Sequence, residues 1–379
     1  MNEAALQLIK EEAYHLGFDG FGVAPPSPDK AADRFRHWLA RHYEGEMAYM
    51  SRWTEKRSDL QKVLPGVKSV ICLRTNYLTA NKTLAFLDAP KTGDISLYAL
   101  NEDYHDVITS RLKILEEKIH SQLPDCRTKI YVDTGPVLEK PLAQKAGLGW
   151  IGKHTNLITQ GEGSWYFLSE ILTDAPFPVA AESIDRCGTC RQCIDICPTR
   201  AIVAPYVLDS RRCISYLNIE LRGVIPLEFR KAIGNHIFGC DDCQIVCPWN
   251  SFAVPGYEKR FQEPLMTTRR LIDLIQLDDE AFRRRFRKSP IKRIKRRGFL
   301  RNVAVALGNS GDPQAVAPLT AVLKDKESLI RAHAVWALGE LMGERALPLL
   351  DEHLAGEKEE IVLAEIREVK ARRQPGRVA

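Results

Sequence analysis

The sequence contains no long apolar run. None of its 379 residues belongs to a stretch that approaches the roughly 18 apolar residues required by a transmembrane helix. The opening segment, MNEAALQLIKEEAYHLGF, has acidic residues at helical spacing and lacks the apolar core of a secretory signal. We therefore expect the protein to stay in the cytoplasm.

One segment lacks acidic residues altogether. Between Arg283 and Arg301 there are eleven lysines and arginines and no aspartate or glutamate, although the whole chain has a net charge of only +5. The rest of the chain is therefore net negative. A solvated helix face is the ordinary explanation of such a run. The absence of interleaved acids favours instead a surface that binds the phosphates of a nucleic acid.

Disulfides are not expected, although the chain has ten cysteines. Eight of them lie between Cys187 and Cys247. A reducing compartment would keep these cysteines as thiols, and clustered thiols indicate a metal centre. Cys72 and Cys126 stand apart and are expected to be ordinary core or surface thiols.

The clustered cysteines follow the pattern of a ferredoxin that holds two [4Fe–4S] clusters. CGTCRQCIDICP, residues 187–198, is a C-x2-C-x2-C-x3-C-P run, in which three thiolates bind one cluster and the fourth binds the other. CDDCQIVCP, residues 240–248, lacks the middle cysteine, for which Cys213 is the spare. Zinc is the alternative, but three cysteines at successive x2 spacing suit a tetrahedral ion poorly. The predicted ligand sets are Cys187, Cys190, Cys193 and Cys247 for the first cluster, and Cys197, Cys213, Cys240 and Cys243 for the second.

Three regions of different composition follow one another. Residues 1–175 mix helical and strand patterns and predict an α/β domain, with helices at 29–43, 104–122 and 138–146 and strands at 68–74, 128–133 and 164–172. Residues 176–255 are rich in cysteine, proline and glycine, which indicates a backbone organised by metal ligation. Residues 256–379 are predicted to be helical. Within them, 303–323 and 334–354 align at a period of 31, typical of paired-helix HEAT-like repeats.

A second unusual stretch runs from Tyr131 to Ile158. Asp133 follows a predicted strand and precedes the turn Thr-Gly-Pro, which would leave its carboxylate facing a crevice. A strand-end aspartate is ordinarily a cap or turn residue. The stretch continues with glycines that would let the backbone approach something flat or bulky, and then with polar side chains. These residues predict a pocket beside an electron relay: Gly147, Gly149, Gly152, Lys153, His154 and Asn156.

These motifs resemble those of the epoxyqueuosine reductases. VDTGPVLEKPLAQKAGLGWIGKHTNLI, CGTCRQCIDICPTRAI and GCDDCQIVCPWN carry the resemblance, which extends over the basic KRIKRRGFLRN segment and the HEAT-like end. It implies a nitroreductase-like cobalamin-binding catalytic domain at 1–175. A ferredoxin-like domain with two [4Fe–4S] clusters would follow at 176–255, and the basic segment with HEAT-like repeats at 256–379.

The resemblance also implies an activity. The enzyme would remove the epoxide oxygen of epoxyqueuosine in the anticodon loop of a tRNA, giving queuosine, with electrons from an external donor. We hypothesise that cob(I)alamin, reduced through the clusters, engages the epoxide. Asp133, which matches the family's proposed proton donor and would be kept protonated by a partly desolvated site, would protonate the leaving oxygen. We expect a monomer.

The resemblance further implies contact residues. The expected cobalamin contacts are Arg57, Ser96, Asp133, Lys153, Asn156, Leu168 and Ser215. The basic segment, for its part, predicts phosphate contacts by Arg293, Lys295, Arg296 and Arg297, and Arg222 is a further expected tRNA contact. The chain departs from the family where it has Leu97-Tyr98-Ala99 and Asn101, because the family usually has Arg-Tyr-Ala and then Gly ahead of Asp-Tyr-His.

Two other functions fit part of the sequence. A corrinoid-dependent reductase of small molecules would share both cofactors, but it needs neither the basic segment nor the repeats. An electron-transfer or scaffold protein would explain the cysteines, but it leaves the stretch from Asp133 to Asn156 without a purpose. Asp351-Glu-His353-Leu-Ala-Gly356 matches a pattern by which histidine coordinates cobalamin. It lies in a predicted repeat helix, so we expect no such role.

Overall fold

The computed structural model describes residues 2–80, 82–262 and 269–373. The chain divides into two compact units, each assembled from three segments. Unit 1 comprises Met1–Lys82, Asn101–Arg211 and Asp242–Glu263, and unit 2 comprises Thr83–Leu100, Arg212–Asp241 and Pro264–Ala379. Within the described residues, no helix combines the length and the apolar character needed to cross a membrane.

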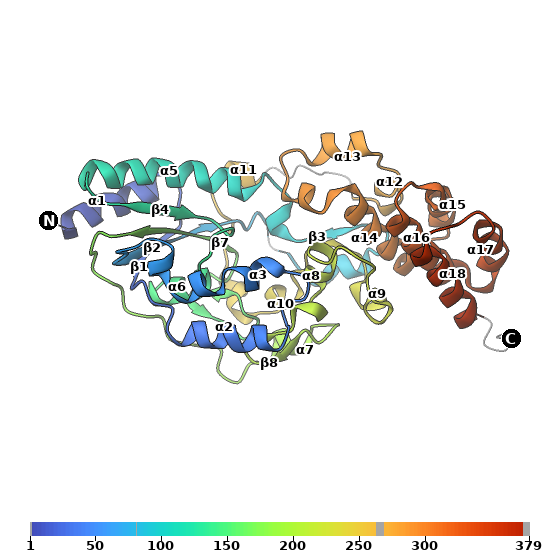
Figure 1. Ribbon diagram of the computed structural model, residues 1–379, viewed down its shortest axis with the longest axis horizontal. Coiled ribbons are helices and arrows are strands. Elements are labelled where there is room, and N and C mark those ends of the chain that lie inside the picture. Colours follow the sequence, from blue (N-terminus) through green and yellow to red (C-terminus); the bar gives the residue numbers. More distant parts are fainter. Residues whose placement is uncertain (1, 81, 263–268, 374–379) are drawn as a thin grey trace. The chain divides into compact units, whose positions relative to one another are not determined.

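Unit 1 is built around a four-stranded antiparallel sheet. Its order is β1 (Gly20–Ala24), β2 (Ser69–Asn76), β7 (Tyr166–Thr173) and β4 (Thr128–Tyr131). Helices α1 (Asn2–His15) and α5 (Tyr104–Gln122) cover one face, and α6 (Glu139–Lys145) covers the other (Figure 1). Because both faces are covered, the central strands β2 and β7 are almost wholly buried.

Local sequence signals account for the longest helix of this unit. Asp103 caps α5 by accepting a hydrogen bond from the backbone N–H of His105, 3.2 Å away. Val107, Ile108 and Leu112 are buried at helical spacing on its inner face. The helix has the bounds predicted from the sequence. The predicted strands at 68–74 and 164–172 are confirmed as β2 and β7, and the predicted helix at 138–146 as α6.

Short elements complete unit 1. A two-stranded hairpin, β5 (Trp150–Ile151) with β6 (Leu157–Ile158), follows α6 in the chain. The others are α2 (Lys30–Ala40), α3 (Ala48–Arg52), α4 (Thr54–Ser58), α7 (Gln192–Asp195), β8 (Ile202–Ala204), β9 (Val207–Leu208), α10 (Asp242–Ile245) and α11 (Lys259–Gln262).

Unit 2 is mainly helical. Its strands are β3 (Asp94–Ile95) and β10 (His236–Phe238), which pair in parallel. Its helices are α8 (Ile214–Ile219), α9 (Leu227–Ile233), α12 (Leu271–Leu274), α13 (Asp279–Phe286), α14 (Lys295–Ser310), α15 (Val316–Ala321), α16 (Ser328–Met342), α17 (Leu347–Leu354) and α18 (Glu360–Arg373).

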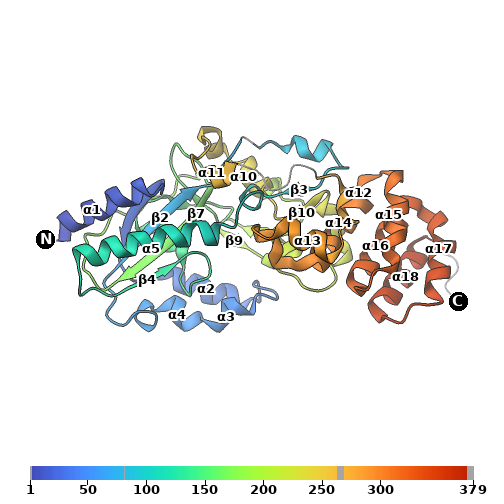
Figure 2. The same cartoon turned by 90° about the horizontal axis from the view of Figure 1, so that it is seen from above.

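The repeat helices pack closely against one another, as Figure 2 shows for α14, α16 and α18. Gly308 of α14 explains part of this closeness. A Cβ atom at this position would lie 2.6 Å from the ring of Trp336 and 2.9 Å from the Cα of Ala337, so only glycine fits. The sequence motif Ala-Leu-Gly therefore marks a helix contact.

Buried charged groups in unit 2 find partners inside that unit. Arg230 and Glu365 form a bidentate pair with N–O distances of 2.6 and 2.9 Å, and both side chains are almost fully buried. Arg301 donates hydrogen bonds to three backbone carbonyls, that of Leu217 in α8 and those of Leu221 and Gly223 just after it. These arginines therefore connect the repeat helices to the rest of unit 2.

Candidate functional site

A cavity of about 150 Å³ opens in unit 1 at the ends of β4 and β7. We call it the Asp133 pocket. One wall is aromatic, because Tyr104 stacks on Phe167 at a centroid distance of 4.1 Å and Tyr77 packs against the same ring at 4.7 Å. The polar lining includes two carboxylates and two amides, those of Asp133, Glu139, Asn156 and Gln244.

Asp133 lies just after β4, in the left-handed backbone region with φ +58°. Aspartate is one of the few residues with a side chain that adopts this conformation readily. The Tyr104 hydroxyl donates a 2.6 Å hydrogen bond to its Oδ2, and Nε2 of His105 lies 3.3 Å from the same oxygen. The sequence had predicted a desolvated, protonated carboxyl. In this structure the side chain is 47 % exposed and faces the Tyr104 hydroxyl and the His105 ring, so it is not desolvated, and its protonation stays a prediction.

His105 is the cationic partner of this carboxylate. Its Nδ1 lies 2.8 Å from Oδ1 of Asp103. Burial disfavours the charged ring, but the interactions with Asp103 and Asp133 outweigh burial and raise the pKa of His105 to about 9. At neutral pH the ring is therefore an imidazolium beside Asp133. The sequence reasoning noted the Asp-Tyr-His run and assigned it no role.

A buried carboxyl pair lies behind Asp133. The backbone N–H of Asp133 donates a 2.7 Å hydrogen bond to Oε1 of Glu139. Glu139 in turn contacts Glu170, which is fully buried on the sheet face covered by α6. Burial, followed by the nearby Asp133 charge, raises the pKa of Glu139 to about 8, and burial also raises the pKa of Glu170. The pair therefore retains at least one proton at neutral pH.

The glycines after α6 allow segments of the protein's own backbone to approach one another closely. Gly149 has φ +153°, and a Cβ atom there would lie 2.2 Å from the carbonyl oxygen of Ile158. The glycine thus lets β5 and β6 approach each other. The sequence had predicted that these glycines make room for something flat or bulky, and at Gly149 the close neighbour is the other arm of the hairpin.

The five residues between β5 and β6, which we call the 152–156 loop, hold the predicted polar groups. Lys153 is buried, and its Nζ donates to the carbonyl oxygens of Gly188 at 2.6 Å and Cys190 at 2.8 Å. Its amine thus binds the first cysteine loop. Asn156 lines the Asp133 pocket, and its Oδ1 accepts a 3.2 Å hydrogen bond from Lys140.

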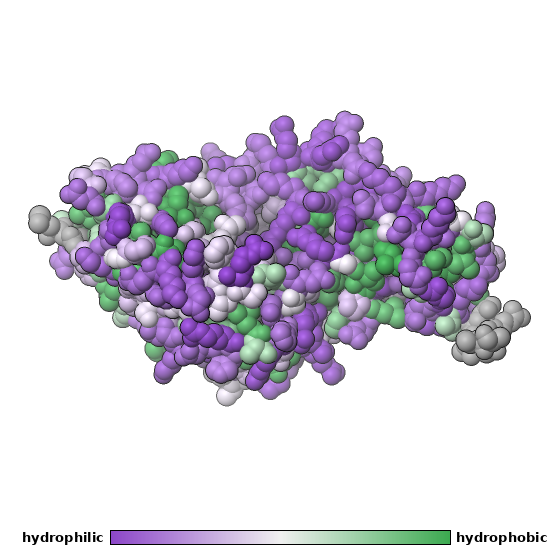
Figure 3. Space-filling view, in the orientation of Figure 1, coloured by the Kyte–Doolittle hydropathy of each residue, from purple (hydrophilic) through white to green (hydrophobic). Residues whose placement is uncertain are grey.

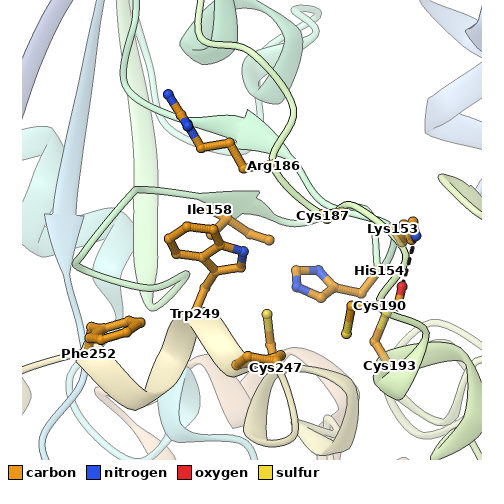
Figure 4. A pocket seen from close by; sticks show the side chains of 11 residues that line it. Lys153, His154, Ile158, Arg186, Cys187, Cys190, Cys193, Cys247, Trp249 and Phe252 are labelled. Carbon is orange, nitrogen blue, oxygen red and sulfur yellow. Dashed lines mark hydrogen bonds between the residues drawn. The ribbon is translucent and has the colours of Figure 1, made fainter.

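The first predicted set of cysteines surrounds one cavity of about 290 Å³ in unit 1 (Figure 4). Its remaining walls are mostly apolar and include Ile158, Trp249 and Phe252. We call it the four-cysteine cavity, after Cys187, Cys190, Cys193 and Cys247. Burial raises the pKa of Cys247 to about 11, so a thiolate there requires cationic partners such as iron. Four thiols in an apolar enclosure fit a [4Fe–4S] cluster.

The second predicted set divides between the units. Cys197 and Cys243 belong to unit 1, and Cys213 and Cys240 belong to unit 2. In unit 1 the backbone N–H of Ala201 donates to the Cys197 sulfur at 3.3 Å. The assignment of these four cysteines to one cluster stays a prediction.

The other predicted cofactor contacts have different surroundings. Arg57 is buried in unit 1 and donates to the carbonyl oxygens of Tyr49 and Gly135, at 3.2 and 3.5 Å. Leu168 lines the Asp133 pocket. Ser96 and Ser215 belong to unit 2, where the Ser96 hydroxyl donates to Asp241 at 2.5 Å. As cofactor contacts, these residues stay predictions.

The predicted tRNA contacts all belong to unit 2. In the same unit, hydrophilic residues cover the surface over α13 (Figure 3). Four of them are exposed: Arg222, Arg293, Lys295 and Arg297. Arg293 also pairs with Glu220. Arg296 differs in its burial: its guanidinium pairs with Asp325 and donates to the carbonyl of Leu277 at 2.6 Å. Its side chain is only 12 % exposed, so it is the weakest candidate of the set.

Comparison with known proteins identifies the separate regions. A family model described as epoxyqueuosine reductase QueG, DUF1730, matches residues 57–134. A model of a 4Fe-4S double cluster binding domain matches 186–250, and a model of HEAT repeats matches 298–369. These matches confirm the predicted iron–sulfur region and the predicted repeats.

Curated relatives extend the similarity to most of the chain. The epoxyqueuosine reductase of Escherichia coli strain K12 is 41 % identical over 348 residues, which cover 91 % of this chain and 91 % of that protein. The epoxyqueuosine reductase of Pseudomonas aeruginosa strain PAO1 is 43 % identical over 339 residues, covering 88 % and 93 %.

Solved structures agree in fold. A crystal structure of epoxyqueuosine reductase with an epoxyqueuosine-modified tRNA stem loop superposes with a TM-score of 0.88 at 29 % identity, covering 97 % of this chain and 98 % of that one. The Bacillus subtilis epoxyqueuosine reductase, described with an aspartate-bearing catalytic loop swung out of the active site, gives 0.87 at 29 % identity, covering 97 % and 99 %. The chain belongs to the epoxyqueuosine reductase family.

Proposed function

We propose that the chain reduces epoxyqueuosine to queuosine in the anticodon loop of tRNA, using cobalamin supplied with electrons by two [4Fe–4S] clusters. The observation that carries this proposal is the pairing of Asp133 with Tyr104 and His105 in a pocket of the same unit as the four-cysteine cavity. The names of the relatives and the stem loop in one solved structure support the choice of substrate.

The reaction needs both electrons and protons at the same site. Two C–O bonds of the epoxide break, a C=C bond forms, and the oxygen leaves as water. Balance requires two electrons and two protons. Iron–sulfur clusters transfer one electron at a time, so an external donor must reduce them twice in each turnover.

Cobalamin is the proposed electron carrier at the substrate. When bound, it supplies a strongly reducing, nucleophilic metal. The Asp133 pocket offers aromatic and apolar walls with the amides of Asn156 and Gln244, which suit the apolar ring and amide side chains of a corrin. The pocket has a volume of about 150 Å³, which is too small for a whole cobalamin. It therefore has room only for the reacting part of the cofactor and the substrate. Arg57, Ser96, Leu168 and Ser215 remain the other proposed contacts. Of these, Arg57, Ser96 and Leu168 belong to the proposed nitroreductase-like domain at 1–175.

The residues of the chain handle the protons. Asp133 faces the pocket and donates one of the two protons to the leaving oxygen, and solvent water supplies the other. A proton must first reach its carboxylate, and the His105 imidazolium is the adjacent source. Substrate that displaces water from the pocket would favour this transfer, because desolvation favours a neutral pair over two opposite charges. Tyr104 holds Oδ2 of Asp133 in position meanwhile.

The exposed cations of unit 2 are the proposed tRNA-binding surface. Contacts between phosphates and Lys295 or Arg297 would provide affinity that weakens with salt. Recognition of the modified base would come from a splayed loop. The monomeric state and the cytoplasmic location stay predictions.

A single experiment tests the reaction. The protein is reconstituted anaerobically with iron, sulfide and cobalamin, and then given a strong reductant and a stem loop that carries epoxyqueuosine. Nucleoside mass spectrometry should show loss of one oxygen only when cobalamin is present. Unchanged stem loop, with both clusters and corrinoid bound, would contradict the proposal and favour a small-molecule substrate.

A further inference from the structure

His154 lies in the four-cysteine cavity. It is the third residue of the 152–156 loop, and its ring is 4 % exposed. Figure 4 shows the ring projecting among the cysteine side chains, with Trp249 and Ile158 on the opposite side. The mechanism described above makes no use of this histidine.

A backbone hydrogen bond determines which ring nitrogen carries the proton. The N–H of Asn156 donates to Nδ1 of His154 at 3.2 Å. Nδ1 must therefore present its lone pair, so the hydrogen of the neutral ring is on Nε2.

The Nε2–H donor has no hydrogen-bond partner among the described residues, although it is completely buried. A buried donor without an acceptor is costly and rare in native proteins. Lys153, the neighbouring cation, does not compete for acceptors in the cavity, because its amine bonds the carbonyls of Gly188 and Cys190. Among the other side chains that line the cavity, the hydrogen-bond acceptors are the sulfur atoms of the four cysteines.

We propose that Nε2–H of His154 donates a hydrogen bond to a sulfur of the cluster held in the four-cysteine cavity, and that this bond raises the reduction potential of that cluster. The inference rests on the proposed binding of a cluster in the cavity. One-electron reduction adds negative charge to the cluster sulfurs. An N–H donor stabilises that charge and so favours the reduced state.

The position of His154 in the chain gives this bond a further role. The N–H that sets its tautomer belongs to Asn156, whose side chain lines the Asp133 pocket. His154, which sets the reduction potential of the cluster, is therefore oriented by Asn156, which lines the Asp133 pocket. His154 is a positioning residue for electron transfer.

The test compares reduction potentials of the reconstituted protein and does not depend on substrate. His154→Leu removes the donor, whereas His154→Gln keeps an N–H donor in a similar volume. His120→Leu is the matched control, since His120 is exposed and bonds Thr128. Iron and sulfide content is measured first, and the potentials are then obtained by titration followed by electron paramagnetic resonance.

The expected result concerns only one of the two clusters. In His154→Leu its potential should become more negative. At a fixed ambient potential, the ratio of reduced to oxidised cluster should fall about tenfold, a shift of ~59 mV for a one-electron couple. His154→Gln should lie closer to the wild type, and His120→Leu should match it. Unchanged potentials in a fully loaded His154→Leu protein would overturn the inference.

A second measurement covers the case in which His154→Leu fails to assemble its clusters. A crystal structure of the wild-type protein with both clusters bound then decides the question. Nε2 within hydrogen-bonding distance of a cluster sulfur supports the inference, and Nε2 bonded to a protein oxygen overturns it. Neither readout requires turnover, so failure of the proposed reaction would be recognised separately.

Discussion

Two buried arginines of unit 2 contrast with two buried groups of unit 1. In unit 2, Arg230 and Arg301 are saturated by Glu365 and by backbone carbonyls of the same unit. In unit 1, the Nε2 of His154 has no hydrogen-bond partner among the described residues, and the Glu170 carboxyl meets only that of Glu139. Groups that the chain itself satisfies stabilise the fold. His154 and Glu139, the partner of Glu170, instead line cavities where chemistry is expected.

This difference predicts which substitutions affect stability and which affect catalysis. Removing one partner of a buried ion pair leaves an uncompensated charge and strongly destabilises the fold. Replacing a polar group that faces a cavity removes little internal bonding, so activity should fall while the fold persists.

The largest effect is expected at Asp133. Asp133→Asn retains a residue that tolerates the left-handed backbone but cannot donate an acidic proton. Turnover should fall by about 10²- to 10⁴-fold, with cluster content and melting temperature unchanged. Rates are measured from the loss of epoxyqueuosine by mass spectrometry. Asp125→Asn, an exposed loop residue, is the control. A variant that kept a tenth of the wild-type rate would remove Asp133 from its role.

Unit 2 should respond in the opposite way. Arg230→Met leaves Glu365 buried without its partner, so the free energy of unfolding of unit 2 should fall by about 3–5 kcal/mol. Urea denaturation followed by circular dichroism measures this change. Arg284→Met, which breaks an exposed pair with Glu280, should cost about 0–1 kcal/mol. Equal losses in the two variants would show that burial does not distinguish these two ion pairs.

A pH profile tests the imidazolium beside Asp133. The pKa of His105 is raised from 6.5 to about 9. The stabilisation of the folded protein by the charged ring is therefore complete below pH 6.5 and is lost as the pH rises through about 9. The charged ring is also the proposed proton source for Asp133, so turnover should decline near pH 9. His105→Gln should be slower and should lack this decline. A wild-type profile that stays flat to pH 10 would contradict the assignment.

The smallest effects are expected in the basic segment. Lys295→Gln and Arg297→Gln should each weaken stem-loop binding a few-fold and reduce the slope of log K against log salt by about 1. Arg296→Gln should mainly lower stability, because Arg296 pairs with Asp325 inside the protein. Fluorescence anisotropy across a salt series measures the slopes. If Arg296→Gln instead reduced the slope of log K against log salt and left stability unchanged, Arg296 would be a phosphate contact like Lys295 and Arg297.

The sequence predicted features that depend on local signals. The bounds of α5 follow from its cap and apolar spacing, and the repeat helices follow from the recurring Ala-Leu-Gly motif. The cysteines of one loop are close in the chain, so their spacing already implies their geometry. The structure adds Cys247 to the same cavity, as the ferredoxin pattern predicted.

Features that depend on strand register were not predictable. Glu170 lies opposite Tyr131 because β7 pairs with β4, and this pairing brings Glu170 close to Glu139 and Asp133. No local pattern indicates that a buried strand residue will meet the first residue of a distant helix. Lys153 was predicted as a cofactor contact, which stays a prediction, and its partners in the structure are carbonyls far along the chain.

The 152–156 loop has a consequence for how the enzyme can vary in evolution. Two backbone hydrogen bonds close it, from Gly152 to Asn156 and from Thr155 to Gly152, each of 2.8 Å. Three successive functions depend on those few residues: Lys153 anchors the cysteine loop, His154 faces the cavity and Asn156 lines the pocket. An insertion or deletion of one residue would disturb all of them together. Natural variants should therefore change loop length elsewhere and keep this span constant.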